Sequence, residues 1–297
     1  MKTGFVGIIG SPNVGKSTLM NSIIGEKIAI ATDKPQTTRN RIRGIFTDIR
    51  DDGGDSAQMV FIDTPGIHRP RNRLGAYMTA AAADTLREVD AVVFVVDRAP
   101  REGADDPVVS LLAGVDTPKI AVINKIDTMP PDLFRSVFGQ YERLGLFRHV
   151  IGVSALEGKN VGKLVDMLKG LLGEGPMFFP ADMVTDHPER FIAAEIIREK
   201  LLLYLDDEVP HGVAVSIESY EEAPGRARIG AVIYCEKKSH KGIIIGKGGR
   251  KLKGVGKSAR AEIESLLGAK VYLELWVKVS ERWRDSEFHL HSLGYGG

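Results

Sequence analysis

The feature that most restricts the fold lies near the start of the chain, where Gly10-Ser11-Pro12-Asn13-Val14-Gly15-Lys16-Ser17 fits the pattern G-x-x-x-x-G-K-S. An apolar run, Phe5–Ile9, precedes this segment, and a helical pattern over residues 15–25 follows it. In such a strand-loop-helix setting the glycines let backbone N–H groups close around a β-phosphate. We expect Lys16 to carry charge to the β- and γ-oxygens and the Ser17 hydroxyl to meet Mg²⁺.

Strand and helix patterns alternate through the first 173 residues. Continuous apolar runs at 91–96 and 120–123 are typical of parallel strands that are covered on both faces. Residues 41–50 and 58–63 are a predicted hairpin. The predicted helices cover residues 15–25, 72–88, 105–114, 131–144 and 160–172. This alternation predicts an α/β domain with a mostly parallel sheet and helices on both faces.

A second pattern begins after a stretch rich in glycine and proline, which is the predicted linker over residues 174–189. The order there is helix, strand, strand, helix, helix and strand, which predicts a smaller α+β domain. Its predicted elements include a helix over 190–205, strands over 213–217, 229–235 and 271–279, and a helix over 249–267. The predicted division is a first domain over 1–173, the linker, a second domain over 190–280 and a tail over 281–297.

The tetrapeptide Asn124-Lys125-Ile126-Asp127 predicts guanine as the base. Its carboxylate can accept hydrogen bonds from guanine N1–H and the exocyclic amine, a pair that adenine does not offer. Such contacts can discriminate strongly, because the wrong base leaves buried groups unpaired. The stem of Lys125 can lie on the purine face, and Asn124 can brace the loop. Ser154 and Ala155, after the next strand, are expected to add a backbone N–H to guanine O6.

Two further motifs are predicted to respond to the metal and the γ-phosphate. Asp63 ends a predicted strand, so its carboxylate can hold Mg²⁺ through water, and Gly66 can offer its N–H to the γ-phosphate. Thr37 and Thr38 lie in the polar stretch 31–41, and one of the two should reach Mg²⁺. A plain loop is the alternative for either threonine taken singly. The expected behaviour is a segment that γ-phosphate orders and hydrolysis releases.

The residue after Gly66 is Ile67, where Ras-type enzymes carry a glutamine that orients water. Isoleucine cannot do this, so catalytic help must come from elsewhere. Asn13 is the candidate ligand of a monovalent cation such as K⁺, which would neutralise charge that develops in the transition state. A structural role in the loop is the alternative for Asn13. The predicted catalytic residues are Lys16, Asn13 and Thr38; no residue is assigned as a general base, and slow intrinsic hydrolysis is expected.

Together these motifs specify GTP as the ligand, Mg²⁺ as the metal and transfer of the γ-phosphoryl group to water as the reaction. The predicted Mg²⁺ ligands are Ser17, Thr37, Thr38 and Asp63. The predicted nucleotide contacts are Gly10, Ser11, Pro12, Asn13, Val14, Gly15, Lys16, Ser17, Thr18, Asp63, Thr64, Pro65, Gly66, Ile67, Asn124, Lys125, Ile126, Asp127, Ser154 and Ala155.

A glycine-lysine loop in the second domain predicts contact with single-stranded RNA. Gly246-Lys247-Gly248-Gly249 joins two helical segments, and glycines there permit a close approach to a sugar-phosphate backbone. From Lys237 to Arg260 there are nine Lys or Arg residues and no Asp or Glu, which is a local basic patch. A G-x-x-G loop in this setting is the KH signature, which clamps about four nucleotides. The predicted RNA contacts are Lys241, Ile244, Gly246, Lys247, Gly248, Gly249, Arg250, Lys251 and Lys253.

Composition favours a two-domain cytosolic protein. The chain has 297 residues and a net charge of +1, so charge as a whole does not indicate nucleic acid. No apolar run approaches the roughly 20 residues that span a bilayer, and no signal peptide is expected because a strand begins almost at once. The single cysteine, Cys235, fits a reducing compartment.

With both halves considered, the chain resembles the Era family of bacterial GTPases over almost its whole length. The first half carries the motifs above together with Gln36-Thr37-Thr38-Arg39, and the second half carries the distinctive segments 242–249 and 273–279. The resemblance implies a P-loop GTPase domain joined to a KH domain of type II order. In that family the KH domain holds the 3′ end of small-subunit ribosomal RNA during assembly of the small ribosomal subunit. GTP favours RNA binding there, and hydrolysis allows release.

The resemblance also implies a cytoplasmic protein that is described at the inner face of the cell membrane as a peripheral protein, and a monomer is expected. The acidic insert at 51–56 is a mild departure from the family pattern. Two alternatives remain: a nucleotide-gated RNA-binding adaptor without significant hydrolysis, and an RNA-modification partner of the same GTPase class.

Overall fold

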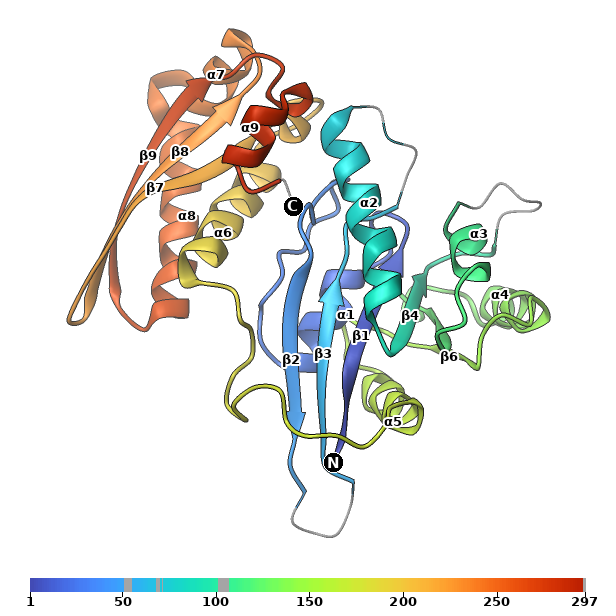
Figure 1. Cartoon of the computed structure of the whole chain (residues 1–297). Helices are drawn as coiled ribbons and strands as arrows, with labels where there is room; N and C mark the ends of the chain where they lie inside the picture. The colour runs from blue at the N-terminus through green and yellow to red at the C-terminus, as the bar shows by residue number, and fades with distance from the viewer. Residues whose placement is uncertain (51–54, 68–69, 71, 101–106, 296–297) are drawn as a thin grey trace. The chain divides into compact units, whose positions relative to one another are not determined.

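The structure, a computed structural model, describes residues 1–50, 55–67, 70, 72–100 and 107–295 (Figure 1). Most of the insert at 51–56 therefore lies outside the described residues. The chain divides into two compact units. The first contains Met1–Ala31, Thr38–Arg69 and Met78–Asp186, and the second contains Thr32–Thr37, Pro70–Tyr77 and His187–Gly297.

A six-stranded sheet forms the centre of the first unit, with the strand order β2-β3-β1-β4-β5-β6. The strands are β1 (Lys2–Gly10), β2 (Ile42–Asp48), β3 (Ala57–Asp63), β4 (Ala91–Val96), β5 (Lys119–Ile123) and β6 (His149–Gly152). β2 and β3 form the predicted antiparallel hairpin, and the other neighbouring pairs are parallel. The carboxyl ends of the parallel strands therefore share one edge, where ligands of α/β sheets bind.

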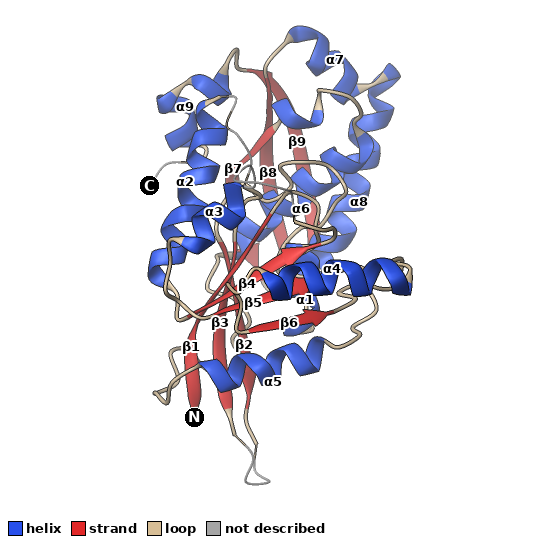
Figure 2. Cartoon of the chain, turned by 90° about the vertical axis from the view of Figure 1, so that its right-hand side faces the viewer, coloured by secondary structure: helices blue, strands red, loops and turns tan. Residues whose placement is uncertain are grey.

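Helices cover both faces of this sheet, as predicted. They are α1 (Lys16–Ile24), α2 (Arg73–Glu88), α3 (Pro107–Ala113), α4 (Pro131–Arg143) and α5 (Val161–Leu171) (Figure 2). Neighbouring strand residues point to opposite faces, and both Ile8 and Ile9 are fully buried. Ile9 belongs to a core cluster that α2, α3 and α4 complete with Leu86, Leu112 and Tyr141. Residues 105–106 of the helix predicted over 105–114 lie outside the described residues.

Part of the predicted linker is bound to the first unit. Ile45 N donates to Val184 O at 2.7 Å. The Gln58 amide oxygen accepts from Phe178 N and Phe179 N at 2.7 and 3.0 Å. Residues 178–184 therefore lie along the hairpin and close part of its backbone edge.

The second unit has the predicted order of elements, built on a three-stranded sheet β7-β8-β9. Its helices and strands are α6 (Glu189–Tyr204), β7 (Ala214–Ala223), β8 (Arg226–Cys235), α7 (Lys238–Ile245), α8 (Arg250–Leu267), β9 (Lys270–Val279) and α9 (Glu287–Ser292). Short 3₁₀ turns lie at Pro210–Gly212, Lys247–Gly249 and Trp283–Asp285. β7 pairs antiparallel with β8, and β8 pairs parallel with β9.

Apolar residues of α6, α8 and one face of this sheet form a single core, including Ile196, Ile229 and Ile263. β7 is longer than the predicted strand over 213–217, because its second half carries mostly exposed polar residues that hide the apolar alternation. Within the described part of the chain, no helix combines the length and the apolar character needed to cross a bilayer.

The segment after β9 is anchored by Trp283, which is fully buried. Its indole Nε1 donates to Gly212 O at 2.9 Å, and its ring stacks on Tyr295 with centroids 5.9 Å apart. The other tryptophan, Trp276, is 48% exposed. Much of the predicted tail thus belongs to the fold of the second unit.

Replacing Trp283 with alanine is expected to destabilise the second unit by about 3–5 kcal/mol, because a large buried side chain is lost. Both tryptophans of the chain lie in this unit, so the remaining one reports urea unfolding by its fluorescence. Trp276→Ala is the matched control, with an expected loss of roughly 1 kcal/mol for a half-exposed side chain. Equal losses would contradict a core role for Trp283.

Candidate functional site

The predicted phosphate-binding loop runs from the end of β1 to the start of α1. Gly15 precedes α1 with φ 94°, and a Cβ built there would lie 2.2 Å from the Asn124 side-chain nitrogen. Only glycine fits this position, because both the conformation and the close approach exclude a side chain. The start of α1 thus presents backbone N–H groups at the carboxyl edge of the sheet, which suits an anion.

Lys16 and Asp63 bury opposite charges beside this loop. Lys16 is 6% exposed, and its ammonium donates to Gly10 O at 3.3 Å and Ser11 O at 3.0 Å. Burial lowers the pKa of Lys16, while the Asp63 charge opposes that shift. Burial likewise raises the pKa of Asp63, and the Lys16 charge and hydrogen bonds from Ser17 and Thr38 oppose it. The charged state of each of these two side chains therefore depends on the charge of the other and on the charge of any ligand bound beside them.

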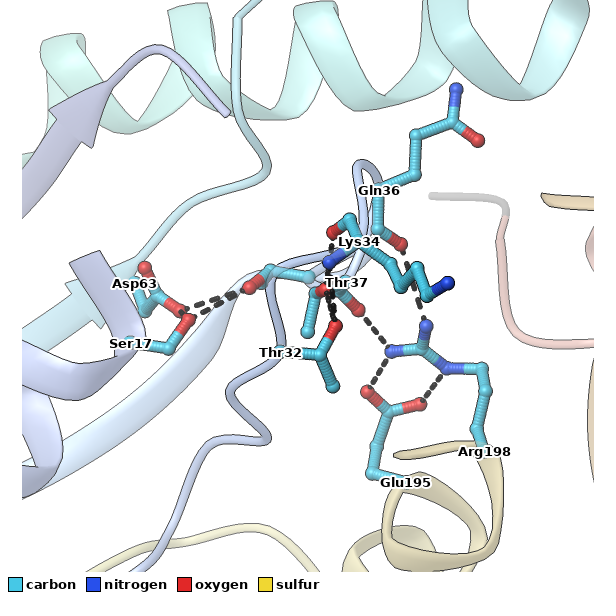
Figure 3. A network of polar contacts seen from close by, with 9 residues as sticks. Ser17, Thr32, Lys34, Gln36, Thr37, Asp63, Glu195 and Arg198 are labelled. Atoms are coloured by element: carbon cyan, nitrogen blue, oxygen red, sulfur yellow. Dashed lines mark hydrogen bonds and ion pairs between the residues drawn. The ribbon is translucent and has the colours of Figure 1, made fainter. Parts of the chain in front are cut away.

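The side chains of Ser17, Thr38 and Asp63 meet at the end of β3, and Figure 3 labels Ser17 and Asp63 of this group. The Ser17 hydroxyl donates to Asp63 Oδ2 at 2.6 Å, and the Thr38 hydroxyl donates to the same oxygen at 3.2 Å. The two hydroxyls lie 2.9 Å apart. Among the described residues, the buried Asp63 Oδ1 has no hydrogen-bond partner. Hydroxyl and carboxylate oxygens are the ligands Mg²⁺ prefers, so these residues fit the predicted metal.

Thr37, the other predicted Mg²⁺ ligand, lies elsewhere. Its hydroxyl donates to Lys34 O at 2.7 Å and lies 2.6 Å from the Thr32 hydroxyl. Its carbonyl accepts a hydrogen bond from Arg198. Of the two threonines, the structure thus brings only Thr38 to Ser17 and Asp63.

The Asn124 side chain connects three predicted motifs, as a residue that braces its loop would. Its side-chain nitrogen donates to Val14 O at 2.9 Å, and its side-chain oxygen accepts from Ala155 N at 3.0 Å. The amide is 2% exposed, so both bonds are protected from water. Because Ala155 N is engaged in this way, a guanine oxygen would have to share or displace that bond.

The loop that is expected to bind the base contains a contact that the sequence did not predict. The Lys125 ammonium donates to Asn13 O and to Asp97 Oδ2, each at 2.7 Å. Asp97 directly follows β4, and a carboxylate at the end of a buried strand was the available signal. Asp127 is exposed, and no described residue forms an ion pair with it. The Asp127 carboxylate is thus open to solvent at the edge where a base is expected.

Ile67 points into the core, where it is 5% exposed beside Ile9 and Ile62. Its side chain is therefore turned away from the predicted γ-phosphate position. The neighbouring Thr64 hydroxyl donates to Ile8 O at 2.8 Å and holds the loop to β1. Asn13 is exposed at the tip of the phosphate-binding loop.

The other predicted nucleotide contacts lie on these same segments. The phosphate-binding loop and the start of α1 contain Pro12, Val14 and Thr18. The segment after β3 contains Pro65 and Gly66, the segment after β5 contains Ile126, and the segment after β6 contains Ser154. A Cβ on Gly66 would lie 2.8 Å from Pro12, so the segment after β3 is in direct contact with the phosphate-binding loop.

The predicted RNA loop joins α7 to α8 in the second unit. Gly246, Gly248 and Gly249 all have positive φ, and Gly249 precedes the first residue of α8. Most of the basic residues around the loop are exposed, including Lys241, Lys247, Arg250 and Lys253, whereas Lys251 is half-buried. The loop therefore presents backbone and cations together at a helix N-terminus.

Ile244 was predicted as an RNA contact, and the structure corrects this. Ile244 is fully buried in the core of the second unit, whereas its neighbour Ile243 is 44% exposed. The helical turn of α7 points these two side chains in different directions. Ile243 is thus the isoleucine available at the surface.

Comparison with known proteins follows the same two-part division. A family model described as a 50S ribosome-binding GTPase matches residues 5–125, and one described as a KH domain matches residues 208–284. Fold and site together define a P-loop GTPase that carries a C-terminal KH domain.

Full-length relatives narrow this class. The chain is 59% identical to GTPase Era of Alkaliphilus oremlandii and 51% identical to GTPase Era of Clostridioides difficile, over at least 98% of each protein. A crystal structure of a variant of Aquifex aeolicus Era bound to GDP·AlF₄⁻ matches all of both chains with a TM-score of 0.92 at 38% identity. The chain belongs to the Era family of GTPases.

Replacing Asn124 with alanine is expected to destabilise the first unit by about 1–3 kcal/mol, because Val14 O and Ala155 N lose a buried partner. GDP binding should weaken about tenfold, since the two loops are no longer tied together. Urea unfolding by circular dichroism and GDP titration measure the two effects. Gln140→Ala, which removes a surface amide on α4, should change neither. An unchanged GDP affinity in Asn124→Ala would contradict the bracing role.

Proposed function

We propose that this protein is a GTP-hydrolysing switch that binds the 3′ end of small-subunit ribosomal RNA and assists assembly of the small ribosomal subunit. The observation that carries this proposal is the likeness, over all of both chains, to Era solved with MgGDPNP and nucleotides 1506–1542 of 16S ribosomal RNA. That match has a TM-score of 0.91 at 38% identity. The 50S description belongs to a family model of residues 5–125 alone, so it does not weigh against the small subunit.

The geometry of the first unit supports phosphoryl transfer to water. Lys16 neutralises charge on the β- and γ-oxygens, and the N–H groups at the start of α1 hold the same phosphates. Ser17, Thr38 and Asp63 would hold Mg²⁺, which would neutralise charge on the phosphate oxygens. Thr38 is the member of this set that comes from the 31–41 stretch, so it is the residue expected to respond to loss of the γ-phosphate.

Asn13 is our candidate for the missing catalytic help. Ile67 is buried and apolar, so it cannot orient the attacking water. Asn13 is exposed beside the position expected for the phosphates, and its carbonyl is fixed by Lys125. A K⁺ ion at Asn13 would offset charge between the β- and γ-phosphates as the bond breaks.

The second unit supports binding of single-stranded RNA. The glycine loop and the exposed Lys241, Lys247 and Arg250 fit a sugar-phosphate backbone. The partners we propose are GTP, GDP and the small ribosomal subunit. The proposed location is the cytoplasm, with peripheral contact at the inner face of the membrane, and the proposed state is a monomer.

Phosphate release from GTP is expected to be slow, to require Mg²⁺ and to be faster in K⁺ than in Na⁺. Asn13→Ala should abolish the difference between the two salts while leaving GDP affinity unchanged. Adenosine triphosphate should not compete, because Asp127 pairs with guanine. If no phosphate is released even with Mg²⁺, K⁺ and RNA present, the result would favour the alternative of an RNA-binding adaptor without significant hydrolysis. A K⁺ effect that survives Asn13→Ala would remove Asn13 from catalysis.

Replacing Lys247 and Arg250 together with alanine is expected to weaken binding to a single-stranded 3′-end ribosomal RNA fragment. The slope of log affinity against log salt should fall by about 1.4, because each phosphate contact to a single strand contributes about 0.7. The double variant Arg87→Ala/Lys163→Ala removes the same charge from exposed positions on α2 and α5 and should leave the slope unchanged. Equal slopes in all three proteins would place the RNA elsewhere. Preference for transfer RNA would favour the RNA-modification alternative.

A further inference from the structure

A buried ion pair on α6 holds the segment that precedes Thr38. Arg198 is 1% exposed and Glu195 is 8% exposed. The Arg198 Nε donates to Glu195 Oε1 at 2.8 Å, and Nη2 donates to Glu195 Oε2. Burial lowers the pKa of Arg198, but the surrounding groups, first among them the Glu195 carboxylate, together outweigh burial and raise the pKa. The guanidinium is thus held charged in a fixed orientation.

The same guanidinium binds backbone oxygens of the 32–37 segment (Figure 3). Nη2 donates to Thr37 O, and Nη1 donates to Gln36 O at 3.4 Å. The planar fork of arginine allows Nη2 and Nη1 to reach two carbonyls while Nε and Nη2 keep the carboxylate. Thr37 O belongs to the peptide bond that joins Thr37 to Thr38. Arg198 therefore holds the peptide whose next side chain lies at Ser17 and Asp63.

The 32–37 segment is internally braced, so it can move as one piece. The Thr32 hydroxyl accepts from Lys34 N at 3.1 Å, and the Thr37 hydroxyl donates to Lys34 O at 2.7 Å. Gln36 is held at φ 61°, which is uncommon for a residue with a side chain. A displacement of Thr38 would thus also move the Thr37 carbonyl, because these hydrogen bonds limit internal deformation of the segment.

The division of the chain into two compact units supports a connection between Thr38 and the second unit. By its contacts the segment Thr32–Thr37 belongs to the second compact unit, although Ala31 and Thr38 belong to the first. The second unit is also the one that carries the basic glycine loop of Gly246–Gly249. Because the 32–37 segment belongs to the second unit and is followed directly by Thr38, it can transmit a displacement of Thr38 to that unit.

We propose that Arg198, oriented by Glu195, is a positioning residue that couples the GTP-dependent placement of Thr38 to the RNA-binding unit. This inference rests on the proposed function, in which Thr38 meets Mg²⁺ in the GTP state. In this role Arg198 acts through the backbone carbonyls of Gln36 and Thr37, and it needs no contact of its own with nucleotide or RNA. Because coupling is reciprocal, RNA must favour GTP over GDP by the same factor by which GTP favours RNA.

Arg198→Lys tests the proposal, because lysine can keep the charge beside Glu195 but lacks the fork that reaches two carbonyls. The matched control is Lys200→Arg on the same helix, where Lys200 pairs with Glu199 and Glu262. Affinity for a 3′-end ribosomal RNA fragment is measured for each full-length protein with a non-hydrolysable GTP analogue and with GDP. The affinities for the two nucleotides are measured in parallel without RNA.

For the unaltered protein and Lys200→Arg, we expect the GTP analogue to raise RNA affinity about fivefold or more, the lower bound of typical coupling. In Arg198→Lys this ratio should approach one, with RNA affinity in GDP unchanged. Affinity for the GTP analogue should fall several-fold, whereas GDP affinity should stay the same. A purely structural role for Arg198 would instead alter both nucleotide affinities together.

Two outcomes would overturn the proposal. The first is a normal ratio in Arg198→Lys, which refutes the coupling role while leaving the proposed switch intact. The second is a ratio of one in the unaltered protein, which removes the switch itself and the coupling with it. Should Arg198→Lys fail to fold, the double variant Glu195→Leu/Arg198→Leu replaces both charges at once, a change that is often neutral for stability. The same loss of the ratio is expected there, and its retention would refute the proposal.

Discussion

The burial of Lys16, at the start of the helix that follows β1, beside Asp63, at the end of β3, is the constraint on which the candidate nucleotide site depends. Removing two ions from water is costly, and their attraction repays that cost only when the geometry is good. β1 and β3 supply this geometry, since they lie side by side and end at the same edge of the sheet. Ligand charges that bind the folded state add stability by mass action. Folding and nucleotide occupancy are thus linked through this one pair.

Most of the candidate nucleotide site could be predicted because the motifs at 10–17, 63–66, 124–127 and 154–155 each come at or just after the end of a strand. Asp63 ends β3, and Asn124 follows β5, so short apolar runs locate them. Parallel pairing then gathers these positions at one edge without any further information from the sequence. The order of elements in the second unit was likewise predictable, because turns and changes of period separate them. Apolar runs, turns and changes of period in the sequence were sufficient wherever the position of a side chain depends only on its own helix, strand or loop.

The remaining contacts depend on tertiary structure. Arg198 and Glu195 read as ordinary charged residues of a helix, and nothing in their spacing shows that a distant loop covers them. The choice between Thr37 and Thr38 depends on backbone direction in a segment without periodicity. Ile243 and Ile244 are adjacent in an apolar run, so hydrophobicity alone could not show which one enters the core. Sequence patterns describe elements better than they describe the contacts between elements.

The double hydrogen bond of Asn124 has a consequence for how binding energy is distributed. One amide connects the loop expected at the phosphates to the loops expected at the base. Contributions from the two ends of the nucleotide are then not independent, and a double-mutant cycle across them should give a non-zero interaction energy. A fragment that carries only the base or only the phosphates would bind more weakly than its share of the contacts suggests. We therefore expect the two ends of the nucleotide to bind this protein cooperatively, within a single ligand.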